Sequence, residues 1–183
     1  MRKPRYSLNT STSGVGRTYP QHQEMLGPYD YDAPDSIKHL RDCNFDFADF
    51  EPNFRTVVLD KRAKATDLIS SVPIPKVGHI VSTRFLDLLR EFKLPPHRLY
   101  PVPMIHKGEP VDGYWFVHLP HPQSLLAATS FRDVEERCST VPELEDVSLL
   151  KLYQPFTLAY TWIDARLKAA IESAGITGVT IGG

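Results

Sequence analysis

The sequence has little of what marks several large classes of protein. Its only cysteines, Cys43 and Cys138, are too few for a disulfide framework and lack the CxxC spacing of zinc and redox sites. No apolar run approaches the ~20 residues that a membrane-spanning helix needs, and the basic residues 1–6 are not followed by the apolar segment of a secretory signal. We therefore expect a cytoplasmic protein with free thiols and no membrane partner.

The signature motifs of phosphate binding and of serine hydrolases are missing as well. The sequence contains no GxGxxG, no GxxxxGKS/T and no GxSxG, which position phosphates or a nucleophilic serine. Its formal net charge is −1, whereas a dedicated nucleic-acid binder needs a surplus of basic residues for phosphate contacts. We expect no cofactor, no resident metal, no nucleic-acid partner and no catalytic activity.

Proline is abundant and spread along the chain, and its 16 residues each remove a backbone donor and end helices. Many short elements are therefore expected. Because predicted strands outnumber helices, the sequence predicts an α+β fold with a mainly antiparallel sheet and a few short amphipathic helices. Strands are expected at 54–60, 99–105, 114–119, 149–152 and 179–181, with helices after Ser82, Ser130 and Asp164 and a helical turn at 66–70.

A pattern of strand end, capping residue and short helix occurs twice. Its two copies are Val81-Ser82-Thr83-Arg84-Phe85 and Ile163-Asp164-Ala165-Arg166-Leu167. Ser82 and Asp164 are suited to cap a helix, because their side-chain oxygens accept from an amide of the first turn. Gly175 suits the left-handed residue that ends the second helix. Arg84 and Arg166 take matching positions at the positive helix ends, so we expect each to form a structural ion pair.

The first 51 residues contain two segments of opposite charge. Residues 1–20 have four basic side chains and no acid, and we expect a flexible basic arm there, ahead of a single domain at 21–183. Residues 24–51 have eight acidic side chains against two basic ones, interleaved with aromatics such as Phe45, Phe47 and Phe50. These three rings are expected to be apolar anchors on the body of the fold, with the carboxylates facing water.

The acidic residues are concentrated at 24–51 and again at 133–146. An acidic surface steers association with a basic partner and competes for the same basic cleft as a nucleic acid or nucleotide. The candidate partner-binding residues are Tyr29, Asp30, Tyr31, Asp32, Glu135, Glu136, Glu143, Glu145 and Asp146.

Two alternative functions have candidate residues of their own. A metal-dependent hydrolase would use histidine and carboxylate ligands, for which the candidates are His106, Asp112, His118 and His121. The proline-containing loop between the last two does not supply the helical face of an HExxH site. A single-stranded RNA-binding module would stack bases on an aromatic strand and use nearby basic residues, for which the candidates are Trp115, Lys61, Arg62 and Lys64.

Six segments stand in a characteristic order: Thr66-Asp67-Leu68-Ile69-Ser70, Val81-Ser82-Thr83-Arg84, Leu99-Tyr100-Pro101-Val102, Tyr114-Trp115-Phe116-Val117, Asp164-Ala165-Arg166-Leu167 and Ala174-Gly175-Ile176-Thr177-Gly178-Val179. In this order they resemble an immunity-protein family of bacterial polymorphic toxin systems, over roughly residues 45–181. The resemblance implies a small cytoplasmic protein that binds a cognate toxin domain and neutralises it without catalysis. We expect it to mask the active site of that toxin.

Overall fold

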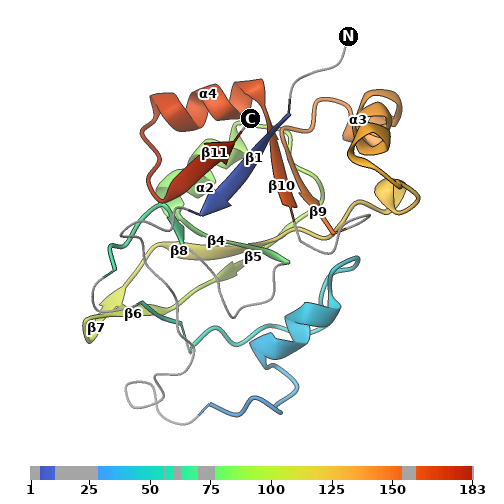
Figure 1. The fold of residues 1–183 in the computed structure, drawn as a ribbon. Coiled ribbons are helices and arrows are strands. Elements are labelled where there is room, and N and C mark those ends of the chain that lie inside the picture. Colours follow the sequence, from blue (N-terminus) through green and yellow to red (C-terminus); the bar gives the residue numbers. More distant parts are fainter. Residues whose placement is uncertain are drawn as a thin grey trace.

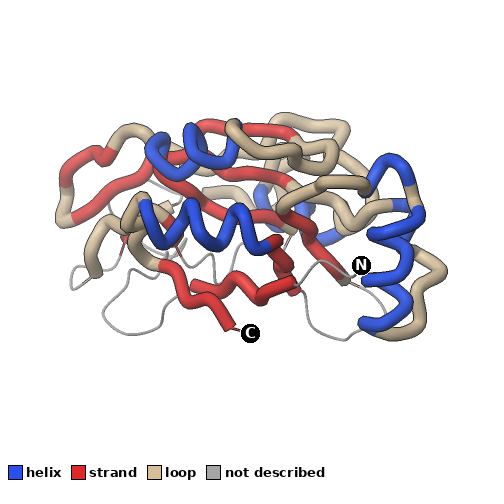
Figure 2. The backbone as a smooth tube through the Cα atoms, turned by 90° about the horizontal axis from the view of Figure 1, so that it is seen from above, coloured by secondary structure: helices blue, strands red, loops and turns tan. Residues whose placement is uncertain are grey.

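The computed structural model of the chain describes residues 5–10, 29–55, 57–59, 63–69, 77–153 and 160–182. The fold is α+β, with mainly antiparallel sheets and short helices packed on them, as the sequence predicts (Figure 1). Two four-stranded sheets and one three-stranded sheet make up the described strands. The view from above shows α2 and α4, the helices of the repeated motif, running beside each other, and the two are in contact (Figure 2).

The first sheet has the strand order β3-β4-β8-β5, and all its neighbours are antiparallel. Its strands are β3 (Leu68–Ile69), β4 (Gly78–Ser82), β5 (Arg98–Pro101) and β8 (Tyr114–His118). The helical turn predicted at 66–70 is wrong, because Leu68 and Ile69 are fully buried and pair with Val81 and Ile80. Burial of these two side chains overrides the capping preference of Thr66.

The second sheet has the order β11-β1-β10-β9 and places the start of the chain in its interior. Its strands are β1 (Arg5–Thr10), β9 (Leu149–Leu152), β10 (Tyr160–Asp164) and β11 (Val179–Gly182). The flexible arm predicted at 1–20 is therefore wrong for residues 5–10, and the rest of that arm lies outside the described residues. Leu8 is buried, and β1 pairs antiparallel with β10 through residues 5–7 and with β11 through residues 7–10.

The third sheet contains the second half of the strand expected at 99–105. Its order is β2-β6-β7, formed by β2 (Val58–Leu59), β6 (Met104–His106) and β7 (Glu109–Val111), with β2 parallel to β6. The single strand expected at 99–105 is broken into β5 and β6, because Pro101 and Pro103 have no amide hydrogen for a ladder. Lys107 and Gly108, with φ of 53° and 91°, form the tight turn between β6 and β7.

The described α-helices begin at a side chain that accepts a hydrogen bond from the amide three residues on. Ser82 caps α2 (Thr83–Arg90), Ser130 caps α3 (Phe131–Thr140) and Asp164 caps α4 (Ala165–Ser173). The acceptor distances are 3.1, 3.2 and 2.8 Å. Three short 3₁₀ helices complete the described helical elements, η1 (Ile37–Asp42), η2 (Gln123–Leu125) and η3 (Pro142–Leu144). The helix positions predicted from capping residues are thus confirmed.

The two arginines that follow the caps form the predicted structural ion pairs. Arg84 Nη1 lies 2.9 Å from Asp67 Oδ2, and Arg166 Nη2 lies 2.9 Å from Asp164 Oδ2. Both carboxylates are buried while both guanidinium groups are half exposed. Each arginine therefore compensates a buried negative charge. The carboxylate in turn offsets the unfavourable position of the arginine's positive charge at a helix N-terminus.

One apolar core cluster joins the two four-stranded sheets. It includes Leu8 from β1, Val81 from β4, Phe85 from α2 and Ile171 from α4. A second cluster lies around Phe116 and a third beneath α3, around Val134 and Trp162. In the part of the chain that the structure describes, no helix is long and apolar enough to cross a membrane.

Candidate partner-binding surface

The residues around α3 and η3 form one of the strongly acidic parts of the described surface. Residues 131–146 have six acidic and two basic side chains, a net charge of −4 in a chain whose total is −1. Because η3 packs against α3, the acids of the two elements belong to one region. We name this region the α3–η3 acidic face, and its members are Glu135, Glu136, Glu143, Glu145 and Asp146. Glu135 is half-buried and the other four are exposed.

The backbone beneath this face is fixed by basic side chains from other elements. Lys93 Nζ donates to the carbonyl of Glu145 at 2.6 Å, and Arg166 Nη2 donates to the carbonyl of Asp146 at 3.1 Å. Both basic side chains bind main-chain carbonyl oxygens in these contacts, and the acidic side chains of Glu145 and Asp146 remain exposed. The face is therefore a set of carboxylates presented from a fixed backbone.

Asp133 is an ionised carboxylate in the first turn of α3, where it pairs with Arg137. Its carboxylate accepts the amide of Thr129 at 3.0 Å and Nε of Arg137 at 3.0 Å, and these two hydrogen bonds lower its pKa. The carboxylate also lies in the first turn of α3, where the helix dipole favours negative charge. The side chain therefore stays ionised at any physiological pH.

The first candidate group, at residues 29–32, is only partly available to a partner. Tyr29 is buried, donates from its hydroxyl to the carbonyl of Asn53 at 3.0 Å and accepts the amide of Ile37 at 2.9 Å. It is a core residue, so its assignment to the partner surface is wrong. Tyr31 is half-buried and packs edge-on against Tyr29, with ring centroids 4.8 Å apart.

The two aspartates of this group are exposed and serve local turns. Asp30 Oδ1 accepts the amide of Asp32 at 2.8 Å, and the carboxylate of Asp32 binds Lys38. That hydrogen bond and the charge of Lys38 lower the pKa of Asp32. Figure 1 shows η1, which follows this group in the chain, well separated from α3, so the structure does not bring the two acidic regions into one surface.

The predicted aromatic anchors are confirmed, and they explain two of the candidate metal ligands. Phe45 and Phe47 are half-buried and lie edge-on against the rings of His121 and His118, at centroid distances of 5.7 and 5.5 Å. His118 Nε2 lies 3.1 Å from the carbonyl of Cys43, and His121 Nδ1 accepts the amide of Tyr153 at 3.0 Å. Burial lowers the pKa of both imidazoles. They hold segment 43–47 against the end of β8.

The remaining candidate ligands do not join these histidines. His106 ends β6, and Asp112 lies exposed in the turn between β7 and β8. Among the described residues, which include all four candidates, no three or more His, Cys, Asp or Glu side chains are grouped so that they could hold a metal ion. The hydrolase alternative therefore has no assembled ligand set in this fold.

The two cysteines and Trp115 are partly buried and contact neighbouring parts of the fold. Burial is the main cause that raises the pKa of both Cys43 and Cys138, which keeps these thiols protonated at neutral pH. Trp115, proposed as a stacking platform, is half-buried and donates from Nε1 to Thr83 Oγ1 at 3.1 Å. Of the basic residues proposed beside it, Lys64 is exposed, and 61 and 62 lie outside the described residues.

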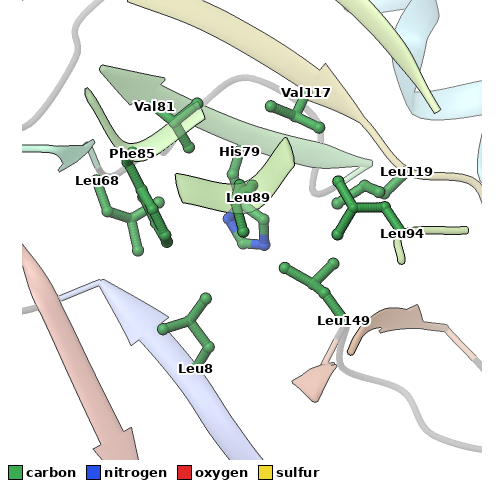
Figure 3. Close-up of a pocket in the computed structure, with 10 residues that line it drawn as sticks. All are labelled: Leu8, Leu68, His79, Val81, Phe85, Leu89, Leu94, Val117, Leu119 and Leu149. Carbon is green, nitrogen blue, oxygen red and sulfur yellow. The ribbon is translucent and has the colours of Figure 1, made fainter. Parts of the chain in front are cut away.

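A polar chain between the two four-stranded sheets is not evident from the sequence, and it joins the buried Lys151 and Thr161 to the half-buried His79. Lys151 Nζ donates to Thr161 Oγ1 at 3.0 Å, and Thr161 Oγ1 lies 2.8 Å from His79 Nε2. His79 lines an apolar pocket together with side chains such as Leu8, Phe85 and Leu149 (Figure 3). Burial, and then the charge of Lys151, lower the pKa of His79 well below 6.5. A lysine within the apolar run Leu149–Leu152 is the signal that could have pointed to this chain.

The exposure of Phe131 at the start of α3 is likewise not evident from the sequence. Phe131 is 37% exposed, directly after the helix cap Ser130, and no apolar periodicity marks it.

Neither protein-family models nor curated proteins give a match to this chain. The surface itself, with its fixed backbone and its ionised carboxylates, is suited to recognise a basic macromolecular surface.

Proposed function

We propose that this chain is a non-catalytic, cytoplasmic immunity protein that binds a cognate bacterial toxin domain and masks its active site. The observation that carries the proposal is the α3–η3 acidic face, where a net charge of −4 gathers on residues 131–146. The resemblance of the six ordered segments to an immunity-protein family supports the same conclusion.

The physical reason lies in the chemistry of the expected partner. A toxin domain that acts on nucleic acids or nucleotides needs a basic cleft for phosphate groups. An acidic face on the inhibitor is attracted to that cleft, raises the rate of encounter and competes with phosphates for the same groups. The fixed carbonyls of Glu145 and Asp146 mean that little backbone order has to be gained on binding.

The test is co-expression with the products of the two genes that flank its own. One product should stop growth when expressed alone, and the full chain should restore growth and co-elute with that product from a sizing column. Continued killing without a complex, for both products, would reject the proposal.

Charge reversal on the face locates the contact. The double variant Glu135→Lys/Glu136→Lys should lower the association rate about tenfold at low salt, with a smaller difference at 0.5 M salt because charges are screened. The matched control is Glu109→Lys/Asp112→Lys, which reverses two exposed acids at β7 and the turn after it, far from α3 (Figure 1), and should leave the rate near that of the wild type. An equal loss in both double variants would mean that only the net charge matters.

A further inference from the structure

We propose that Phe131 is the apolar anchor of the partner contact, a side chain that inserts into an apolar pocket lined at its rim by basic groups of the partner protein. The inference rests on the proposed function and deepens it, since it names the central contact and the shape that the toxin surface must offer.

The large apolar side chains that are exposed to solvent lie around the start of α3. In the described residues, the exposed large hydrophobic side chains are Leu126 and Phe131, at 38% and 37%. Both flank the start of α3, and Ala127 between them is exposed as well. Exposed apolar side chains with charged neighbours are the usual composition of a protein contact, with apolar groups at the centre and polar groups at the rim.

Phe131 differs from Leu126 in having a rigid aromatic base. Its ring stacks on Trp162 of β10, with centroids 5.0 Å apart and planes 23° apart. Tyr160 meets the same ring edge-on at 5.4 Å. Trp162 is only 8% exposed, so the base belongs to the core beneath α3. A ring held this way loses little side-chain entropy on binding, which is the property of interface hot spots.

The charge of the surrounding surface indicates which partner can bind. Glu135 lies one helical turn beyond Phe131, on the same side of α3, and residues 131–146 keep a net charge of −4 with Arg132 and Arg137 included. In a two-fold dimer of this chain the acidic face would meet its own copy, and like charges would oppose the contact. A partner with a basic rim would gain from the same charges. The geometry therefore points to a basic protein surface rather than a second copy.

The experiment measures binding of the full-length variants to the flanking gene product that the wild type neutralises. Phe131→Ala should weaken the equilibrium binding by about 30-fold or more, mainly through faster dissociation, as expected for a central hot spot. Leu126→Ala removes a side chain of equal exposure without the aromatic base and should weaken binding less than about fivefold. Because the rim charges act on encounter, the loss in Phe131→Ala should be nearly the same at 0.05 and 0.5 M salt.

Phe131→Leu keeps an apolar cover on Trp162 and guards against a variant that fails to fold. It should melt within a few degrees of the wild type and still bind about tenfold more weakly, since the aromatic shape is lost. Unchanged affinity in folded Phe131→Ala would overturn the inference while leaving the proposed function intact. A Phe131-dependent dimer of the chain alone, seen by sedimentation, would also overturn it. Failure of the wild type to bind either flanking product would reject both.

Discussion

Thr177 donates two hydrogen bonds to the carboxylate of Asp67, which lies 110 residues earlier in the sequence. The backbone amide and the hydroxyl of Thr177 each lie 2.8 Å from Asp67 Oδ2. The same carboxylate accepts Ser82 Oγ at 2.7 Å and Arg84 Nη1 at 2.9 Å. One buried side chain therefore ties the segment before β3 to the start of α2 and to the turn between α4 and β11.

We expect Asp67→Asn to lower the free energy of unfolding by about 2–3 kcal/mol. The amide group that replaces one oxygen faces the donors of Thr177 or Ser82, and a buried donor loses its acceptor. Burial opposes ionisation of Asp67, but the hydrogen bonds from Thr177 and Ser82 and the charge of Arg84 outweigh it and lower the pKa. The stabilisation is therefore complete above the unfolded pKa of about 3.9 and is lost as pH falls through the lower, folded pKa.

Urea unfolding at pH 7 and at acidic pH measures both effects. Asp87→Asn is the control, because Asp87 pairs with Arg90 on the exposed side of α2 and an exposed pair contributes at most about 0.5 kcal/mol. If the two variants were destabilised equally, Asp67 would not connect the three elements in the way the hydrogen bonds indicate.

The elements that follow from local rules are those that the sequence predicts correctly. Ser82 and Asp164 cap helices where their side chains and the following apolar stripes require it, and Gly175 adopts the left-handed conformation with φ of 60°. These features depend on neighbours within a few residues. The α+β class follows from the count and spacing of such elements.

What the sequence does not reveal depends on distant partners. β1 has only Tyr6 and Leu8 as apolar residues, and its neighbours in the sheet lie more than 150 residues away. Tyr29 looks like an exposed aromatic among acids, yet its hydroxyl finds partners at Ile37 and Asn53 in the core. Of the candidate site, the acids of α3 and η3 are exposed or half-buried as expected, whereas the exposure of Phe131 depends on where β10 places Trp162.

Gly178 is expected to be far less tolerant of alanine than Gly175. Both have positive φ, 79° and 60°, so alanine is strained at either position. A Cβ at Gly178 would lie 2.2 Å from the carbonyl oxygen of Leu68 on β3, whereas a Cβ at Gly175 has no neighbour within 4 Å. Gly178→Ala should therefore cost about 3–5 kcal/mol and Gly175→Ala about 1 kcal/mol.

Denaturant midpoints of the two glycine variants, measured side by side, check this difference. Because φ is positive at both positions, the difference between the two variants reports the close approach of residue 178, just before β11, to β3. Equal costs would mean that β3 can shift away without loss.

The polar chain of Lys151, Thr161 and His79 predicts a loss of stability in mild acid. Lys151 Nζ donates to Thr161 Oγ1, and the same hydroxyl is within hydrogen-bond distance of His79 Nε2. The ammonium of Lys151 so close to the ring disfavours a second positive charge on the imidazole. Burial and the nearby ammonium lower the pKa of His79 well below 6.5, so the unfolded chain binds a proton at higher pH than the folded one.

The sign of the pH effect follows from that difference. Stability is constant above the unfolded pKa of about 6.5 and falls as pH drops below it, by up to about 1.4 kcal/mol per pH unit from His79 alone. His118 and His121 add losses of the same sign, because burial lowers their pKa values too. In His79→Gln the slope between pH 6 and 5 should be shallower by about 1 kcal/mol per pH unit. His97→Gln, at an exposed histidine, should keep the wild-type slope, and equal slopes in all three proteins would show that His79 is protonated in the folded chain.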